Sequence, residues 1–389
     1  MMLTTLSDAL LIMKGILVAV TAALSVQAAQ VAFHFSQADI DSGAALASLS
    51  KTAYDNAMSR LGKNGCTKET VRVRKEWRKM TVDERIAYRK AIECLMEQKS
   101  LYNSTIAPGA RTLWDDFGVL HYLQTPMTHY SATFLLWHRY FNQVLEDNMR
   151  DKCGYKGVVS YWEWGLDCGN VDQSPLFDGS ESSLGSNGEY IGAHRSVAGF
   201  GAQGGTGGGC LKAGPFANYT VNIGPVGSAH PLAYNPRCIK RDLNAQICAK
   251  WVSLRNTTDP ILNSKNVEIF QAVLQADGRY AEARNLGMAV HGGGHYTISG
   301  DPGGDFYFSP LEPGFYLHHG GIDRMHFIWQ NLDWENRQTI AGTRTMYNQP
   351  PSANATLDDV QDMAPLGGQK TLRELMDTVG GTPFCYVYE

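Results

Sequence analysis

Several common functional motifs are missing from this chain of 389 residues. No CxxC pair occurs, which argues against zinc ribbons and thioredoxin-type redox sites. The glycine-rich stretch 199–209 lacks the GxxxxGK[ST] pattern, so a surface loop explains it better than a phosphate-binding loop. No long run of like charge occurs, and the net charge is −4. Nucleic-acid binding, disorder and coiled coil are therefore unsupported.

Long hydrophobic runs are also scarce at the N-terminus. The apolar stretch there covers only residues 15–26, which is too short to span a bilayer. Lys14 precedes it and small residues up to Ala28 follow it, a pattern typical of a secretory signal peptide. We therefore predict a signal peptide over residues 1–28, with translation starting at Met13, and one catalytic domain over residues 29–389. A buried N-terminal helix is the alternative.

Cysteines and glycosylation sequons agree with that prediction. The chain has eight cysteines, and an even number is typical of disulfides formed in an oxidising compartment. Their connectivity stays open, because eight cysteines can pair in many ways. We expect N-glycans at four Asn-x-Ser/Thr sequons, which begin at Asn103, Asn218, Asn256 and Asn354. Together these features predict a secreted, extracellular protein.

Hydrophobic periodicity predicts helices in several places. Helical spacing of apolar residues occurs over 37–59, 83–99 and 266–290. Residues 170–240 are rich in Gly, Ser and Pro, which predicts a long surface loop pinned by Cys210.

The most informative stretch, residues 121–146, contains His121, His129 and His138. Apolar residues spaced around His138 predict an amphipathic helix that directs this histidine into a core. A buried imidazole needs a partner, because an unpaired buried polar group costs about 1–3 kcal/mol. For a single histidine, a hydrogen bond to the backbone would be a sufficient explanation.

A second stretch repeats the arrangement. His291 and His295 lie four residues apart in an HGGGH motif, and the pair His318 and His319 heads another apolar helical run. Two separate sets favour metal ligands over core histidines. Each interior glycine weakens a helix by about 1 kcal/mol, so we expect a substrate ring or neighbouring backbone to approach this turn closely.

The residue types narrow the choice of metal. Imidazole suits zinc, copper, iron and nickel. HGGGH lacks the glutamate of the HExxH motif, so no general base lies between its histidines, as a zinc hydrolase would require. Six histidines without a carboxylate or thiolate ligand favour two copper ions that cycle between Cu(I) and Cu(II).

Three motifs resemble those of a known family: FLLWHRYF (134–141), HGGGH (291–295) and EPGFYLHHGGIDR (312–324). In these the chain resembles the tyrosinase/catechol oxidase family, the type-3 copper phenol oxidases, over most of residues 50–389. The resemblance implies a mainly α fold in which a four-helix bundle carries a dicopper centre, with long disulfide-pinned loops and few short strands. It also implies the copper ligands, which are His121, His129 and His138 for one ion, and His291, His295 and His319 for the other.

The resemblance implies roles for neighbouring residues. His318 would pack beside the ligands, and Asp323 would anchor its helix. Gly292 stands where some monophenol-hydroxylating relatives carry an asparagine, and Glu282 stands where some members carry a water-orienting glutamate. Phe306 matches the place of a gate phenyl ring over the second copper in plant relatives, with core packing as the alternative.

The chain differs from the family pattern at two positions and matches it at its C-terminal end. Relatives often link the second ligand of the first copper to a cysteine, but no cysteine lies between Cys94 and Cys153, so we predict no thioether at His129. Glu163 stands in YWEW, where the family usually reads YWDW. The closing YVY resembles the word that ends the family's catalytic domain, so we expect a fungal-like short form without a C-terminal shielding domain.

The resemblance implies a copper-dependent oxidoreductase that oxidises o-diphenols to o-quinones with O2, together with weaker o-hydroxylation of monophenols. Its expected partners are a small phenol and O2, and neither nucleic acid nor, after signal cleavage, a membrane. Oxidation of o-aminophenols is one alternative. Haemocyanin-like oxygen carriage is another, which the single small domain and secretion disfavour.

Overall fold

The computed structural model describes residues 33–199 and 201–389. The predicted signal peptide and the start at Met13 lie outside the described residues. The described part is mainly helical. Its α-helices are α1 Gln37–Ser42, α2 Ala44–Ser59, α3 Val82–Glu97, α4 Leu113–Thr128, α5 Phe134–Cys153, α6 Ala245–Trp251, α7 Leu254–Asn263, α8 Val267–Gln275, α9 Ala289–Ile298 and α10 Gly314–Leu332.

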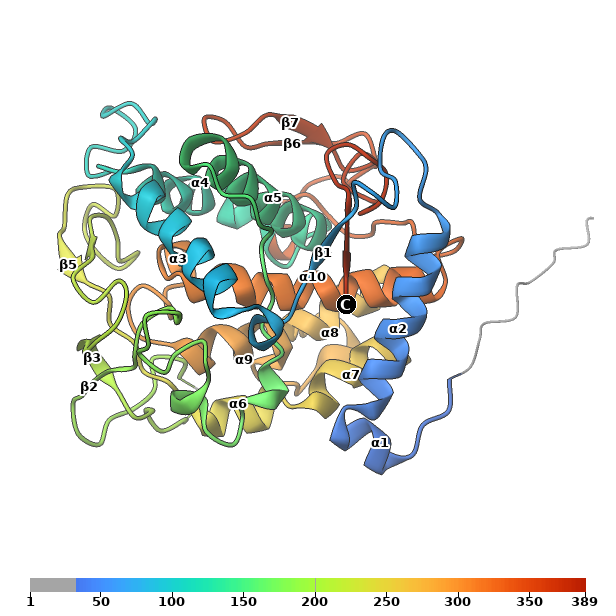
Figure 1. Ribbon diagram of the computed structural model, residues 1–389, viewed down its shortest axis with the longest axis horizontal. Coiled ribbons are helices and arrows are strands. Elements are labelled where there is room, and N and C mark those ends of the chain that lie inside the picture. Colours follow the sequence, from blue (N-terminus) through green and yellow to red (C-terminus); the bar gives the residue numbers. More distant parts are fainter. Residues whose placement is uncertain (1–32, 200) are drawn as a thin grey trace, which may run out of the picture. The chain divides into compact units, whose positions relative to one another are not determined.

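Helix α10 crosses the middle of the fold, with α4 and α5 on one side and α8 and α9 on the other (Figure 1). Every residue of α10 from Gly314 to Asn331 is buried. A helix buried on every side lies in the core of the protein, and its polar residues there need partners. The predicted histidines come from α4, α5, α9 and α10 or their ends, which confirms a four-helix bundle around the site.

Local signals explain where the ligand-bearing helices begin and end. Helix α4 starts at a capping box in which the Thr112 side chain accepts from the Asp115 N–H and Asp115 bonds back to Thr112. Helix α5 ends at Gly154, which adopts the left-handed conformation (φ 66°) that closes many helices. These signals set the outer ends of the two helices that carry the first three predicted ligands.

The strands are short and form four two-stranded sheets among the described residues. Strand β8 near the end of the chain pairs in parallel with β1, in register Arg72 to Tyr386. A disulfide beside this pair joins Cys66 to Cys385. The strands are β1 Arg72–Arg74, β2 Gly188–Tyr190, β3 Gly208–Leu211, β4 Thr220–Val221, β5 Arg237–Cys238, β6 Val360–Asp362, β7 Gln369–Thr371 and β8 Tyr386–Tyr388.

All eight cysteines are paired. Besides Cys66–Cys385, the disulfides are Cys94–Cys153, Cys168–Cys248 and Cys210–Cys238. The last of these pins the predicted surface loop at Cys210. Since no cysteine is free, none is left for a thioether to His129.

Two predicted helices differ from the observed ones. The helix expected over 266–290 is wrong as a continuous element, because α8 ends at Gln275 and α9 begins only at Ala289. Ala276 takes a left-handed conformation (φ 53°), which stops α8. The segment 37–59 is divided by Gly43 at φ 82°. Within the described part of the chain, no helix is both long and apolar enough to cross a membrane.

Candidate metal centre

Three histidines from α4 and α5 meet in the core and form the first histidine set, His121, His129 and His138. Their ligand nitrogens lie within 4.8 Å of one another, and each residue is at most 3% exposed. Nε2 of His121 and of His138 is buried without a hydrogen-bond partner among the described residues. Such orphaned nitrogens are the atoms that a shared metal ion would satisfy.

Backbone carbonyls fix the orientation of these imidazoles. Nδ1 of His121 lies 2.8 Å from the Tyr307 carbonyl oxygen, and Nδ1 of His138 lies 2.8 Å from that of Phe134. Nδ1 of His129 lies 3.2 Å from the Thr125 carbonyl oxygen. Because a carbonyl only accepts, each Nδ1 carries the proton and leaves the Nε2 lone pair for a metal.

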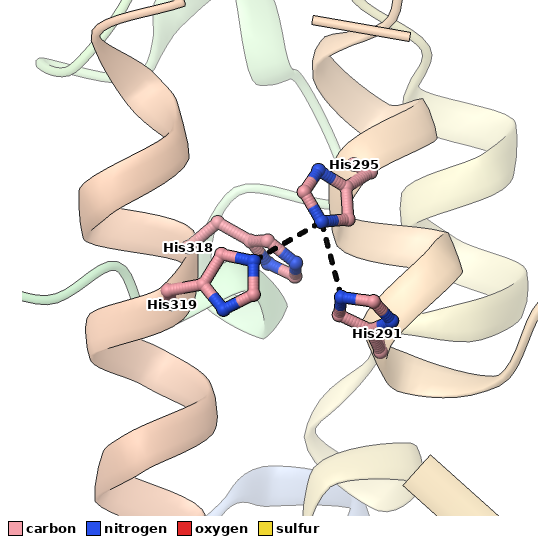
Figure 2. Close-up of side chains that lie close together, drawn as sticks. All are labelled: His291, His295, His318 and His319. Carbon is pink, nitrogen blue, oxygen red and sulfur yellow. Dashed lines mark hydrogen bonds between the residues drawn. The ribbon is translucent and has the colours of Figure 1, made fainter. Parts of the chain in front are cut away.

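The second histidine set is His291 and His295 of α9 with His319 of α10, which face each other across the bundle (Figure 2). Nε2 of His295 lies 3.1 Å from Nε2 of His291 and 3.2 Å from Nε2 of His319. Nitrogens that each bind one ion at about 2 Å come this close together. The second set therefore also fits a metal ion.

Steric contacts explain why two of the three glycines of HGGGH have no side chain. A Cβ on Gly293 would lie 2.5 Å from the Cβ of Trp251, and one on Gly294 would lie 2.2 Å from the His318 ring. A Cβ on Gly292 would meet only Met288, at 3.3 Å. Two of the three glycines thus admit neighbouring side chains against α9, while Gly292 has room for a side chain.

His318 lies behind His319 in Figure 2, and no dashed line reaches it. It is fully buried, and neither of its ring nitrogens has a hydrogen-bond partner among the described residues. Its ring packs 5.4 Å from that of Trp164 and 4.4 Å from that of His295. The residue is close enough to the second set to be grouped with it, and its described contacts are ring packing together with an approach to the His291 carbonyl.

The two sets adjoin. The rings of His138 and His319 stack 4.3 Å apart at an interplanar angle of 10°. Phe315, one turn before His319, contributes an apolar wall, with its ring 4.2 Å from that of His319 and 5.6 Å from that of His121. Sequence reasoning did not single out Phe315; its position four residues before a ligand on one helix was the available signal.

Burial controls the charge of the site. It lowers the pKa of His121 to about 4 and that of His295 to about 3. The pKa values of His129, His138 and His319 fall well below the usual value, first through burial and then through neighbouring histidines. The imidazoles are therefore neutral at neutral pH, which is the form that binds metals.

A buried ionic cluster ties the two ligand helices together behind the site. Asp323 accepts from Nε of Arg139 at 2.6 Å and from the hydroxyls of Tyr386 and Tyr388 at 2.6 and 2.7 Å. Arg139 directly follows His138, and Asp323 lies one turn after His319. The position of Asp323 agrees with the anchoring role that the resemblance implies.

The other predicted site residues are placed differently. The Phe306 ring lies 4.6 Å from the ring of His129, so its described histidine contact is with the first set. The Glu282 side chain is 45% exposed and its carboxylate lies 3.8 Å from Nζ of Lys265. Among its described contacts, none brings Glu282 to the histidines.

A helical bundle that buries two adjoining sets of three neutral imidazoles defines the class of dinuclear type-3 copper proteins. The sequence comparisons agree. The family model described as "Common central domain of tyrosinase" matches residues 111–332. The chain belongs to the tyrosinase family.

Fungal relatives share most of the chain. An N-acetyl-6-hydroxytryptophan oxidase of Emericella nidulans is 34% identical over 83% of this chain and 94% of its own length. Tyrosinase P of Aspergillus terreus is 31% identical over 81% of this chain and 91% of its own. A polyphenol oxidase from Thermothelomyces thermophila, solved as a glycine-to-asparagine variant, matches with TM-score 0.82 at 35% identity over 89% of this chain and 98% of that chain. The protein is a copper oxidoreductase of the polyphenol oxidase type.

Proposed function

We propose that this polyphenol oxidase oxidises o-diphenols to o-quinones, with two diphenols consumed for each O2 reduced to two waters. The observation that carries the proposal is the pair of buried histidine sets, each with its ligand nitrogens within 4.8 Å of one another, which adjoin where the rings of His138 and His319 stack. Copper ions bound there would supply the electron transfer between phenol and O2.

The protein's own residues hold and shield the centre. The backbone carbonyls of Tyr307, Thr125 and Phe134 keep the Nε2 lone pairs of the first set aimed inward. Phe315 and Phe134 pack against the imidazoles and exclude water from that side. The Arg139–Asp323 pair holds α5 and α10 at a fixed separation.

Two observations favour diphenols over monophenols. Gly292, next to His291, offers no side chain that could help to deprotonate an incoming phenol. The carboxylate of Glu282 is partly exposed and lies 3.8 Å from Nζ of Lys265, and no described contact joins it to the histidines, which supports a minor role for it in orienting water. We therefore propose only weak o-hydroxylation of monophenols.

Initial rates on copper-loaded protein test this function. We expect fast O2 uptake with a catechol and slow uptake with tyrosol, and Gly292→Asn should raise the monophenol rate relative to the catechol rate. An o-aminophenol turned over faster than catechols would favour the alternative oxidase. Reversible O2 binding without turnover of any of the three would overturn the proposal in favour of oxygen carriage.

We also propose that the protein is secreted, which the four disulfides support. Asn103, Asn218 and Asn354 are exposed, whereas Asn256 is half-buried in the first turn of α7 and bonds the Ser253 hydroxyl. Glycans should therefore occupy the first three sequons and leave Asn256 free. Glycopeptide mass spectrometry of protein from the culture medium checks both statements, and protein retained inside the cells would contradict secretion.

A further inference from the structure

A cavity of about 670 Å³ lies outside the copper site, between α2, β1, the Tyr161–Glu163 segment and α10. Its volume falls within the range of small-molecule sites, about 300–1,000 Å³. Arg324 of α10 lines it, five residues after His319 and so about 140° away around the helix. The cavity and the copper ligands therefore use different faces of α10.

The guanidinium of Arg324 is only partly used by the protein. Its Nη1 donates to a carboxylate oxygen of Glu163 at 2.7 Å, and its plane lies over the ring of Tyr161 at 4.7 Å. Nε is buried without a partner, and no bond from Nη2 to any described residue occurs. Nε and Nη2 form the side-on fork that binds a carboxylate through two parallel hydrogen bonds. A buried arginine side chain, 9% exposed, thus keeps its fork free.

A second buried polar group lines the same cavity. The Ser50 hydroxyl of α2 has no hydrogen-bond partner among the described residues, and Ser50 is 5% exposed. Leaving such a group unsatisfied costs about 1–3 kcal/mol. Two unsatisfied polar groups in one cavity point to a ligand with hydrogen-bonding oxygens.

The other residues that line the cavity indicate the polarity and charge of the rest of the ligand. Apolar surface comes from Leu46, Val73, Leu166 and Leu254, and Leu166 is 54% exposed. The other charged lining groups are matched in pairs: Lys51 with Asp55, Arg78 with Glu76, and Lys79 with Glu389. Arg324 is itself matched by Glu163, so the lining has no surplus of positive charge. The cavity therefore disfavours a doubly charged phosphate more strongly than a single carboxylate, whose oxygens the remaining N–H groups of Arg324 would bind.

We propose that this cavity is a second ligand site, separate from the copper centre, for a small amphipathic monocarboxylate. The carboxylate binds the free fork of Arg324 and accepts from the Ser50 hydroxyl, and the apolar body lies against Leu46 and Leu254. This site is independent of the phenol that the copper centre oxidises.

Calorimetric titration of the copper-loaded protein tests the proposal with three probes of equal chain length: octanoate, octanamide and octylamine. Octanoate should bind with one site per chain, octanamide at least tenfold more weakly, and octylamine not at all. Equal affinity for octanoate and octanamide would overturn the role of the Arg324 fork, and no octanoate binding would overturn the site itself.

Two tryptophan variants on α2 locate the binding. Ala47 is exposed and lines the cavity, so Ala47→Trp should fill it and weaken octanoate binding at least tenfold. Ser48 is exposed on the same helix but does not line the cavity, and Ser48→Trp is the matched control that should leave binding unchanged. Catechol oxidation should be unaffected in both variants. Octanoate binding that survives in Ala47→Trp would place the ligand elsewhere, including the copper centre, and contradict the proposal.

Discussion

The two histidine sets are held in different ways. In the first set, Nδ1 of every imidazole contacts a backbone carbonyl, two of them four residues earlier in the chain. In the second set, no described residue bonds Nδ1 of His291, His295 or His319, and Nδ1 of His319 is buried without a partner. Packing takes over this role, through the close contacts that Gly293 and Gly294 permit.

The difference indicates where each set is vulnerable. Local hydrogen bonds within α4 and α5 orient two of the first three ligands as soon as these helices form. The second set depends on remote side chains, since Trp251 and His318 must reach α9 before its two histidines can face α10. Changes to packing should therefore affect the second copper more than the first.

Acid should produce the largest change, because burial is common to both sets. Without copper, folded His121 stays neutral down to a pKa of about 4 and His295 to about 3, whereas unfolded histidines protonate near pH 6.5. Between these values the unfolded state binds more protons, so stability falls as pH falls. We expect a loss of about 1.4 kcal/mol per pH unit for each such histidine. Urea denaturation of chelator-treated protein at pH 8, 7, 6 and 5 measures this loss in the free energy of unfolding.

The midpoint should change little between pH 8 and 7 and drop steeply below 6.5. Carboxylates with lowered pKa values, such as Asp323, act only at a pH below about 4. Burial raises the pKa of Asp116 to about 6, so this carboxyl gains a proton on folding below pH 6 and offsets the loss from about one histidine. An equal midpoint at pH 7 and 5 would contradict the neutral, buried state of both sets.

Substituting one ligand should break the symmetry between the sets. His319→Phe should reduce the copper content from two ions to one and lower catechol turnover by more than a thousandfold, because Nε2 of His319 faces that of His295. His318→Phe is the matched control and should retain both ions, since the His318 ring packs against Trp164 and His295. Copper content measured by mass spectrometry and catechol turnover measured by O2 uptake test both variants. Loss of an ion from the His318 variant instead would reverse the ligand assignment.

Much of this site could be predicted from the sequence, because ligand spacing is a property of the local helix. The same is true of the bond from His138 to the Phe134 carbonyl, four residues back. The break at Ala276 could not be predicted, because alanine is the strongest helix former and only tertiary packing stabilises its left-handed conformation. The contact between Phe306 and His129 could not be predicted either, because residues distant in the chain determine the path of the loop that contains Phe306.

A single methyl group on α9 tests the role of packing in the second set. In Gly294→Ala the new Cβ would lie 2.2 Å from the buried His318 ring, so we expect a loss of about 1–3 kcal/mol in stability. We also expect at least tenfold weaker retention of the second copper against a chelator. Gly292→Ala, whose Cβ meets only Met288 at 3.3 Å, should stay within about 1 kcal/mol and keep both ions. Equal copper loss in the two variants would show that packing at Gly294 does not hold the second set.

The smallest effect should come from weakening one hydrogen bond in the first set. The Thr125 hydroxyl donates to the His121 carbonyl at 2.6 Å and lies 3.2 Å from Nδ1 of His121, which the Tyr307 carbonyl also holds. Because that carbonyl remains, Thr125→Val should cost only about 0.5–1.5 kcal/mol in stability. It should weaken retention of the first copper by less than tenfold, and Thr125→Ser, which keeps the hydroxyl, should match the wild type in chelator competition. Loss of the second copper from the valine variant would mean that the two sets are coupled, and that local bonding in one and packing in the other are not separate means of support.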